Sequence, residues 1–320
     1  MQFDDIYALV DADLAKVKQV LLGVNGQEYP WLSEQLEYLF RAFGKGIRPA
    51  VTLLAGKFYD YNLEYLLPMA VSVELMHTAT LVHDDAIDNS EVRRGQATIN
   101  RLWGNDIAIL LGDYLFARAG EFVADTCTPR VIKLFSHTLA VISSGEINQY
   151  QSAFNADQTR EEYFRRIFRK TASLFSLATE AGAVLSRAPE EGVTALREFS
   201  ENMGIAFQVV DDILDFIGNE QILGKPVGSD LSQGTLTLPA IMFLERSPKD
   251  NPVRKLFDTR DVSLVPEVIA AVRDTTIIDE CYQVAGEYSE AAKEYIARLP
   301  KCVAGEAFTM LADYLLRRED

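Results

Sequence analysis

The chain has 320 residues, of which 48% are hydrophobic, and its formal net charge is −16. This composition is ample for a substantial core, although length alone does not decide between one domain and two. The negative charge argues against nucleic acid and against a strongly anionic membrane surface as partners. The three cysteines, Cys127, Cys281 and Cys302, lie far apart without metal-ligand spacing, so we expect reduced thiols in a cytoplasmic protein.

No segment of the sequence indicates insertion into a membrane. The first residues, Met1–Asp5, are acidic where a signal peptide would be basic. The apolar run Ile107–Leu111 is short, and Asp106 and Asp113 bracket it. Since no apolar run approaches the roughly 20 residues of a bilayer span, we expect no integral membrane segment.

Helical periodicity runs through the whole chain. Apolar residues recur at three- and four-residue intervals in several long stretches, and no run of alternating β-branched residues competes with them. These stretches are Ile6–Leu22, Leu66–Val82, Val131–Gln149, Tyr163–Leu185 and Val193–Ile217. Turn signals are few, and no linker of disordered composition interrupts the sequence. We predict a single all-α domain over residues 1–320, a large helical bundle of about ten or more helices.

The first cationic segment is Gly44–Pro49, which contains Lys45 and Arg48. A helix is expected to start there, because proline favours the first helical position. Arginine can grip phosphate oxygens in a bidentate fork, and lysine serves as a mobile point charge. Each of these cations alone could equally be ordinary surface charge.

Asp84, Asp85 and Asp88 form an acidic cluster in an apolar, helix-favouring stretch. Residues four apart share a helix face, so Asp84 and Asp88 repel each other unless a cation neutralises them. Hard divalent cations such as Mg²⁺ take carboxylate oxygens and commonly complete their shell with substrate phosphates. A calcium loop fits poorly, because glycine is missing from the sixth position. A single cluster of this kind could equally be a solvated acidic face of a helix.

The same spacing recurs at Asp211, Asp212 and Asp215, again among apolar neighbours. Two copies with identical spacing make two solvated faces a poor explanation. The sequence therefore predicts that the two clusters form two walls of one metal–phosphate site.

Further cations follow the acidic clusters along the chain. Arg93 and Arg94 lie just beyond the first cluster, and Lys170 lies within a predicted helix. Lys225 belongs to Gly218–Pro239, a segment rich in Gly, Ser and Thr directly after the second cluster. This segment is either a surface connection or, as we expect, a mobile lid that carries Lys225 over the site.

Other polar residues receive a plainer interpretation. Arg165, Arg166 and Arg169 are read as a solvated helix face. His77 lies about two helical turns before Asp84 and shares its face, although a lone histidine is more often structural. No Ser-His-Asp or Cys-His arrangement indicates a protein nucleophile.

Taken in chain order, these elements closely resemble the trans-isoprenyl diphosphate synthases of the polyprenyl synthetase family, in particular the long-chain type. The matching elements are Gly44–Pro49, His77–Gly95, Gly145–Glu146, Lys170–Ala172, Phe207–Asp215 and Gly224–Lys225. The resemblance covers nearly the whole chain. It implies an isoprenoid synthase fold, an all-α bundle around a central cavity, usually in a homodimer.

The resemblance also implies a Mg²⁺-dependent prenyltransferase, which joins isopentenyl diphosphate to an allylic diphosphate by ionisation, condensation and elimination. By this resemblance, Asp84, Asp88 and Asp211 would bind a cluster of three Mg²⁺ ions directly. Asp85, Asp212 and Asp215 would act mainly through water or from outside the first coordination shell. Its implied contacts to the allylic diphosphate are Arg93, Lys170 and Lys225, and those to isopentenyl diphosphate are Lys45, Arg48, His77 and Arg94. Backbone carbonyls near Lys170 and Thr171, with the Gln208 side chain, are expected to stabilise the positive carbon.

Small residues precede the first acidic cluster. Val73, Met76 and Thr80 stack above Asp84 in successive turns, each rising about 5.4 Å, close to one extended isoprene unit. Ala79 and Thr80 are the fifth and fourth residues before Asp84, and in this family small residues there accompany long products. We expect an open tunnel and an all-trans product of about six to nine isoprene units. Candidates for the opposite wall are Phe135, Leu139 and Ile142, each of which alone is more typical of a core residue.

Several alternatives stay open beside this interpretation. If the product is shorter than expected, the chain is a geranylgeranyl diphosphate synthase. If the chain does not act as a homodimer, it is the catalytic subunit of a heteromeric synthase. A terpene cyclase is disfavoured, because the second aspartate cluster is intact and Lys45, Arg48 and Arg94 are present. A metal-binding scaffold would bind Mg²⁺ without turnover. The sequence leaves the allylic starter open.

Overall fold

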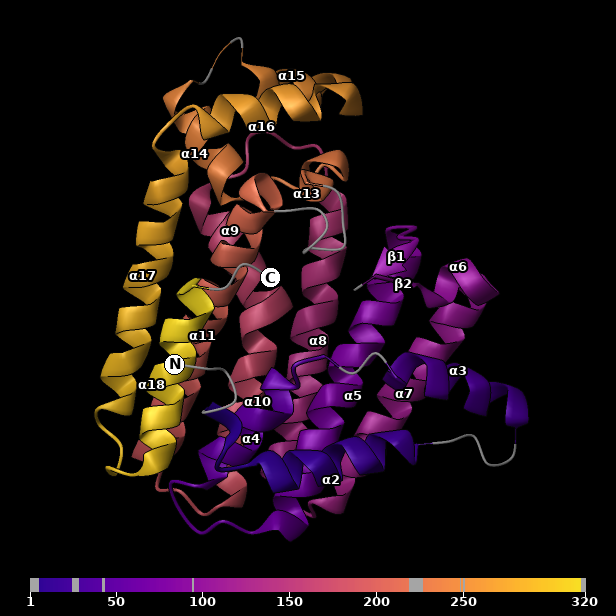
Figure 1. The fold of residues 1–320 in the computed structure, drawn as a ribbon, viewed down its shortest axis with the longest axis vertical. Coiled ribbons are helices and arrows are strands. Elements are labelled where there is room, and N and C mark those ends of the chain that lie inside the picture. The colour runs from indigo at the N-terminus through magenta and orange to yellow at the C-terminus, as the bar shows by residue number, and fades with distance from the viewer. Residues whose placement is uncertain are drawn as a thin grey trace. The chain divides into compact units, whose positions relative to one another are not determined.

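The computed structural model describes residues 6–24, 29–41, 44–93, 95–218, 227–247, 249 and 251–317. Within these residues the strands are β1 (Val92–Arg93) and β2 (Gln96–Ala97), which pair antiparallel in a short hairpin, and nearly everything else is helical (Figure 1). The prediction of an all-α protein is therefore confirmed.

The chain separates into two compact units, each assembled from segments that are distant in sequence. Unit 1 comprises Met1–Leu139, Leu174–Phe199 and Tyr295–Leu311. Unit 2 comprises Ala140–Ser173, Ser200–Glu294 and Ala312–Asp320. The single domain over residues 1–320 stays a prediction.

Unit 1 holds the first acidic cluster on its longest helix. Its helices are α2 (Asp11–Leu22), α3 (Pro30–Arg41), α4 (Ile47–Gly56), α5 (Leu63–Ile87), α6 (Ile99–Trp103), α7 (Asn105–Asp125) and α10 (Ser173–Leu185), with parts of α8 (Pro129–Gln151), α11 (Glu190–Ile217) and α18 (Val303–Arg317). Asn62 starts α5, because its side chain accepts a hydrogen bond from the Glu64 amide at 3.0 Å.

Close packing against α7 fixes the position of α5. The Ser72 hydroxyl donates a 2.8 Å hydrogen bond to the buried Ala119 carbonyl. Gly112 leaves room for His83, since a Cβ there would lie 2.1 Å from the imidazole ring. Both contacts let the helices approach closely along the length that ends at the first acidic cluster.

The length and composition of α5 alone would allow it to cross a bilayer. It is the one helix among the described residues with this property, but 61% of its most apolar window is buried inside the protein. Such burial is typical of the core helix of a globular unit.

Unit 2 holds the second acidic cluster. Its other elements are α9 (Arg160–Ile167), the π-helix η1 (Phe168–Ala172), α13 (Ser229–Ser232), α14 (Leu238–Arg246), α15 (Pro252–Thr259), the 3₁₀ helix η2 (Val262–Leu264), α16 (Val265–Arg273) and α17 (Ile277–Ile296). The stretch predicted as one helix over Tyr163–Leu185 is therefore divided by a π-helical turn.

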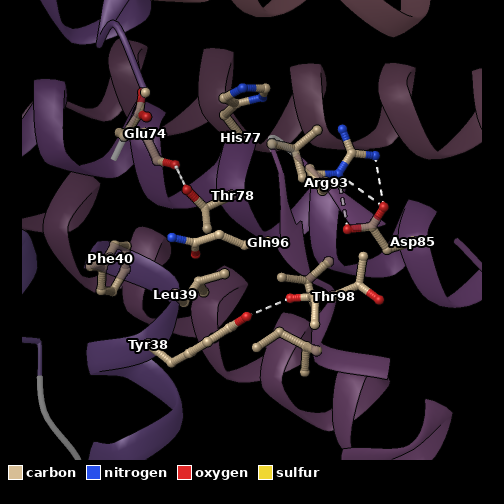
Figure 2. Close-up of a pocket in the computed structure, with 15 residues that line it drawn as sticks. Tyr38, Leu39, Phe40, Glu74, His77, Thr78, Asp85, Arg93, Gln96 and Thr98 are labelled. Carbon is tan, nitrogen blue, oxygen red and sulfur yellow. Dashed lines mark hydrogen bonds and ion pairs between the residues drawn. The ribbon is translucent and has the colours of Figure 1, made fainter. Parts of the chain in front are cut away.

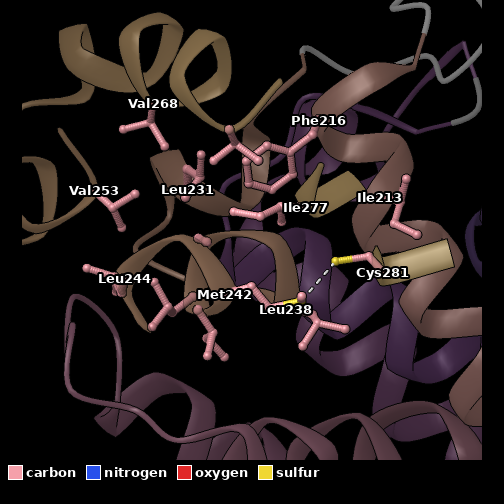
Figure 3. Packing of buried hydrophobic residues seen from close by; sticks show 14 of the residues in the cluster. Ile213, Phe216, Leu231, Leu238, Met242, Leu244, Val253, Val268, Ile277 and Cys281 are labelled. Atoms are coloured by element: carbon pink, nitrogen blue, oxygen red, sulfur yellow. Dashed lines mark hydrogen bonds between the residues drawn. The ribbon is translucent and has the colours of Figure 1, made fainter. Parts of the chain in front are cut away.

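A core cluster in unit 2 anchors the helix of the second acidic cluster (Figure 3). Ile213 and Phe216 of α11 are completely buried there, beside Leu231 of α13 and Cys281 of α17. The Cys281 Sγ lies 3.5 Å from the Met242 sulfur, and burial raises the pKa of this thiol to about 12. All three cysteines are free, as predicted.

Candidate functional site

The first cationic segment brings Arg48 to His77. Gly46 precedes α4 with a φ of 62°, a left-handed conformation that glycine adopts without strain. From the first turn of α4, Arg48 Nη1 lies 3.1 Å from His77 Nε2, and its guanidinium lies 4.5 Å from the Phe175 ring centroid. Lys45 is exposed just before the helix. Two predicted phosphate ligands are therefore adjacent within unit 1.

A pocket with a cavity volume of about 80 Å³ lies beside His77 in unit 1 (Figure 2). Three predicted site residues, His77, Asp85 and Arg93, line it. Its wall also includes Tyr38, whose hydroxyl donates to the Ala97 carbonyl at 2.7 Å, and Gln96 of the hairpin. The sequence interpretation missed these last two residues, because nothing in their local pattern marks them.

The first acidic cluster lies at the end of α5. The helix ends at Ile87, and Asp88 caps it with its amide donating to the Asp84 carbonyl at 2.8 Å. Asp88 is exposed, Asp84 is half-buried and Asp85 is only 5% exposed. The burial of the three carboxylates thus increases in the order Asp88, Asp84, Asp85.

Asp85 is paired with Arg93, which the hairpin places opposite it. Arg93 Nε lies 2.9 Å from both carboxylate oxygens and Nη2 lies 2.8 Å from Oδ1 (Figure 2). Burial raises the pKa of Asp85, an effect that Arg93 opposes and the charge of Asp84 reinforces. Burial by itself lowers the pKa of Arg93, but its bond to Asp85 raises that pKa overall. Arg94, the other predicted cation, lies outside the described residues.

In the second cluster, Asp212 is held by two side-chain donors. It is 3% exposed, and it accepts hydrogen bonds from the Tyr163 hydroxyl at 2.7 Å and from Gln208 Nε2 at 2.9 Å. Burial, together with the nearby charge of Asp230, raises the pKa of Asp212 to about 7, although both donors act in the opposite direction. Asp211 is half-buried.

Asp215 accepts hydrogen bonds from residues of the segment that follows α11. This fully buried carboxylate accepts from the Ser229 hydroxyl at 2.9 Å and from the Asp230 amide at 3.2 Å, so it caps α13. Leu231 and Leu236 beyond it are also fully buried. These contacts do not fit a mobile lid over residues 227–239. Residues 219–226, with the predicted ligand Lys225, lie outside the described residues.

The π-helix η1 presents Lys170 and Thr171. Lys170 Nζ lies 3.0 Å from Glu146 Oε1, and the Thr171 hydroxyl donates to Gln208 Oε1 at 2.6 Å. Single π-turns of this kind occur frequently at functional sites. The structure connects Thr171, Gln208 and Asp212 in one hydrogen-bonded chain. Sequence reasoning named Gly145-Glu146 but gave Glu146 no partner, and it missed Tyr163.

One interpretation of the arginines in α9 is wrong. Arg166 is only 6% exposed and donates from Nη1 to Gln158 Oε1 at 2.6 Å, and from Nη2 to the Leu236 carbonyl. It is therefore not part of a solvated helix face. Arg165 is exposed and pairs with Glu161 at 2.7 Å, as the solvated interpretation expects.

The predicted tunnel residues are part of the core of unit 1. Val73, Met76 and Ala79 are completely buried, whereas Thr80 is half-buried and donates to the His77 carbonyl at 2.7 Å. Of the candidates for the opposite wall, Phe135 and Ile142 are buried and Leu139 is half-buried. The tunnel itself stays a prediction.

Metal ligation within one unit is limited. Among the residues that the structure describes, no group of three or more His, Cys, Asp or Glu side chains could hold a metal ion. Each acidic cluster by itself therefore offers at most part of a metal site, and further oxygen ligands are needed to complete one.

Comparison with known proteins identifies the family. The profile of the family described as polyprenyl synthetase matches residues 29–273. Component 2 of the heptaprenyl diphosphate synthase of Geobacillus stearothermophilus is 39% identical over 319 residues, which cover 100% of both chains.

Two solved structures share the fold over nearly all of the chain. The heptaprenyl diphosphate synthase of Staphylococcus aureus has a TM-score of 0.93 at 35% identity, covering 97% of this chain and 99% of that one. A polyprenyl synthase of Caulobacter crescentus, crystallised with calcium and isoprenyl diphosphate, has a TM-score of 0.95 at 31% identity, covering 100% and 98%. The isoprenoid synthase fold is thus confirmed, and the chain belongs to the polyprenyl synthetase family.

Proposed function

We propose that the chain is a long-chain trans-prenyltransferase, which adds isopentenyl diphosphate to an allylic diphosphate and releases an all-trans polyprenyl diphosphate. The observation that carries this proposal is the shared arrangement of the two acidic clusters. In each, the first aspartate is half-buried and the second is buried in hydrogen bonds from protein donors. The heptaprenyl synthases among the relatives support a product of about six to nine isoprene units.

The donor chemistry fits Mg²⁺, of which we propose three per site. Asp84, Asp88 and Asp211 are its proposed direct ligands, and all of them offer the oxygen atoms that hard cations prefer. Asp85, Asp212 and Asp215 are proposed to act through water or by positioning. Diphosphate oxygens and carboxylates of both clusters would together complete the coordination. When bound, Mg²⁺ stabilises the negative charge that develops on the leaving diphosphate.

The cations of each unit are assigned to the two substrates. Lys45, Arg48, His77 and Arg94 are proposed to hold isopentenyl diphosphate, and Arg93, Lys170 and Lys225 are proposed to hold the allylic diphosphate. The 3.1 Å contact between Arg48 and His77 supports the first group, because it fixes the guanidinium for bidentate binding. Arg94 and Lys225 rest on their motif positions alone.

Residues on η1 and α11 are proposed to stabilise the positive carbon. Gln208 is oriented at both ends, by the Thr171 hydroxyl at Oε1 and by the Asp212 carboxylate at Nε2. Its carbonyl oxygen keeps a second lone pair that can face a cation. Lys170 and Thr171 contribute backbone carbonyls from the π-helix. The proton lost after condensation would pass to the departing diphosphate, which acts as the base.

Assembly as a cytoplasmic homodimer is part of the proposal. On α7, Ile109 and Leu110 are adjacent in sequence and expose 48% and 63% of their surface, so this part of α7 is where we place the contact with a second copy. The competing proposal is that this chain is a catalytic component that needs a second, different component. It is supported by the Geobacillus relative, which is described as component 2 of its synthase.

Incorporation of radiolabelled isopentenyl diphosphate by the purified chain tests the proposal. With Mg²⁺ and an allylic starter, we expect products of about six to nine units in chromatography. Asp84→Asn and Asp211→Asn should each abolish incorporation, while Glu91→Gln at an exposed position just before β1 should not. Geranylgeranyl diphosphate as the end product would contradict the chain length. Activity that appears only after a second component is added would identify the heteromeric assembly.

A further inference from the structure

Unit 2 contains a second pocket, on the part of α8 that follows Leu139 and beside α9 and η1. Its cavity volume is about 120 Å³, roughly ten times the 10–15 Å³ that a single water needs. Its walls are polar and include Asn148 of α8, Ser152 and Asn155 of the connection that follows α8, and Arg165, Arg166 and Arg169. None of its polar lining side chains is assigned to either substrate or to the metal in the proposed prenyl transfer.

The charge of this pocket is opposite to that of the chain. Three arginines line it, against one lining carboxylate, Glu162. That carboxylate is already engaged, since Glu162 Oε2 accepts from the Thr159 amide at 2.8 Å and from the Thr159 hydroxyl at 3.1 Å. Arg165 also pairs with Glu161 at 2.7 Å, so the excess of positive charge comes from Arg166 and Arg169. A local excess of positive charge in a protein of net charge −16 calls for a physical explanation.

Arg166 is the most constrained of the three arginines. It is 6% exposed, and its guanidinium donates hydrogen bonds to the neutral acceptors Gln158 Oε1 and the Leu236 carbonyl. The charge of Arg166 acts on the buried carboxyl of Asp212, whose pKa it lowers, but among the described residues no direct hydrogen bond joins the two. A bound anion would accept hydrogen bonds from this buried guanidinium and further offset its desolvation.

Arg169 lies against α8 because of a glycine. A Cβ at Gly145 would lie 2.9 Å from Arg169 Cβ, so the glycine allows this close approach. Arg169 is half-buried, and among the described residues its guanidinium has neither an ion pair nor a side-chain hydrogen bond. It therefore retains donors for a ligand in the pocket.

We propose that this pocket binds an inorganic oxyanion of the phosphate class, either phosphate or diphosphate. Guanidinium groups bind such anions through paired, charge-assisted hydrogen bonds, and the Asn148 amide adds a neutral donor. The lining residues among those described carry no apolar side chain that could hold a prenyl tail. Since Arg169 precedes Lys170 on η1, the anion is held by the same π-helix that presents Lys170 and Thr171.

Phosphate binding by the metal-free full chain tests this site without relying on prenyl transfer. We expect equilibrium dialysis with labelled phosphate, at constant ionic strength, to reveal a class of sites that Arg165→Gln/Arg169→Gln weakens at least about tenfold. The control Arg298→Gln/Arg317→Gln removes the same charge from exposed positions and should leave that class unchanged. Equal binding by both double variants would overturn the proposal.

A second variant keeps every arginine. Asn148→Asp places a negative charge in the pocket at constant size and should cause the same loss, whereas Gln283→Glu on exposed α17 should not. Phosphate binding that survives Asn148→Asp would also overturn the site. An inactive enzyme that still shows the Asn148-sensitive class would refute the proposed prenyl transfer and leave this inference standing.

Discussion

The guanidinium of Arg93 contacts both carboxylate oxygens of Asp85, the middle aspartate of the first acidic cluster. In the second cluster the Tyr163 hydroxyl plays the equivalent part for Asp212. The donors differ, a charged fork in one case and a neutral phenol in the other, but both middle aspartates are held in place and buried. Each cluster thus combines a positioned carboxylate with a more accessible one that precedes it.

Removing Arg93 should destabilise unit 1, because a buried carboxylate would lose its charged partner. We expect Arg93→Gln to lower the free energy of unfolding by about 1.5–3 kcal/mol in the metal-free protein. In a double-mutant cycle with Asp85→Asn, the coupling should be about 0.5–3 kcal/mol, measured by guanidinium titration. The exposed pair of Arg101 and Glu91, 3.2 Å apart, is the control, with a coupling of about 0.2–1 kcal/mol. Equal coupling free energies for the two pairs would show that burial does not strengthen the interaction between Arg93 and Asp85.

The pKa of Asp212 predicts a pH dependence of stability. Its folded-state pKa of about 7 lies above the ordinary value of 3.8, so the folded state binds the proton more tightly than the unfolded state does. This contribution to stability is complete below pH 3.8 and is lost as the pH rises through 7. Guanidinium unfolding in EDTA should therefore show a decline between pH 4 and 7 that Asp212→Asn lacks. If the free energy of unfolding depends on pH in the same way in both proteins, the raised pKa of Asp212 is refuted.

The regular helices were accessible to sequence reasoning, because apolar periodicity directly reflects which face is buried. This periodicity correctly located α5, α8 and α11, and with them the helices of both acidic clusters. It did not reveal the π-helix, because a single π-turn is defined by its backbone hydrogen bonds, which apolar periodicity does not report. Consequently Tyr163–Leu185 was predicted as one helix.

Pairings distant in sequence were also beyond prediction. The bond between Tyr163 and Asp212 joins residues 49 positions apart, and nothing in either local pattern marks it. Arg166 looked like a surface charge because charged residues are rarely buried, yet its donors reach Gln158 and the Leu236 carbonyl. Local composition predicts average burial, whereas the tertiary structure decides the individual case.

Gly145 should be required for the contact between α8 and η1. An alanine there would place its Cβ 2.9 Å from Arg169 Cβ, which forces the two helices apart. We expect Gly145→Ala to cost about 1–3 kcal/mol of stability, and to slow prenyl transfer because Lys170 lies on η1. In Gly286→Ala, the control, no atom lies within 4 Å of the new Cβ. That helical substitution should stabilise by about 0.5–1 kcal/mol, so thermal unfolding distinguishes the two.

The length of the product tests the role proposed for the face of α5 before Asp84. Ala79 is completely buried, so the ring of Ala79→Tyr has to occupy space that is now apolar interior. We expect chromatography to show a product several isoprene units shorter, with incorporation of isopentenyl diphosphate largely retained. Overpacking should also lower stability by about 1–3 kcal/mol, which circular dichroism on heating measures.

Ala79→Ser provides the matched control for that experiment. It adds one hydroxyl at the same position without a bulky group, so the product should keep its length even if the buried hydroxyl lowers stability. A folded Ala79→Tyr protein that still makes the full-length product would show that the growing chain does not pass this residue. The proposed tunnel beside Met76 and Thr80 would then be wrong, while the assignment of both acidic clusters would stand, because product length and ionisation depend on different residues.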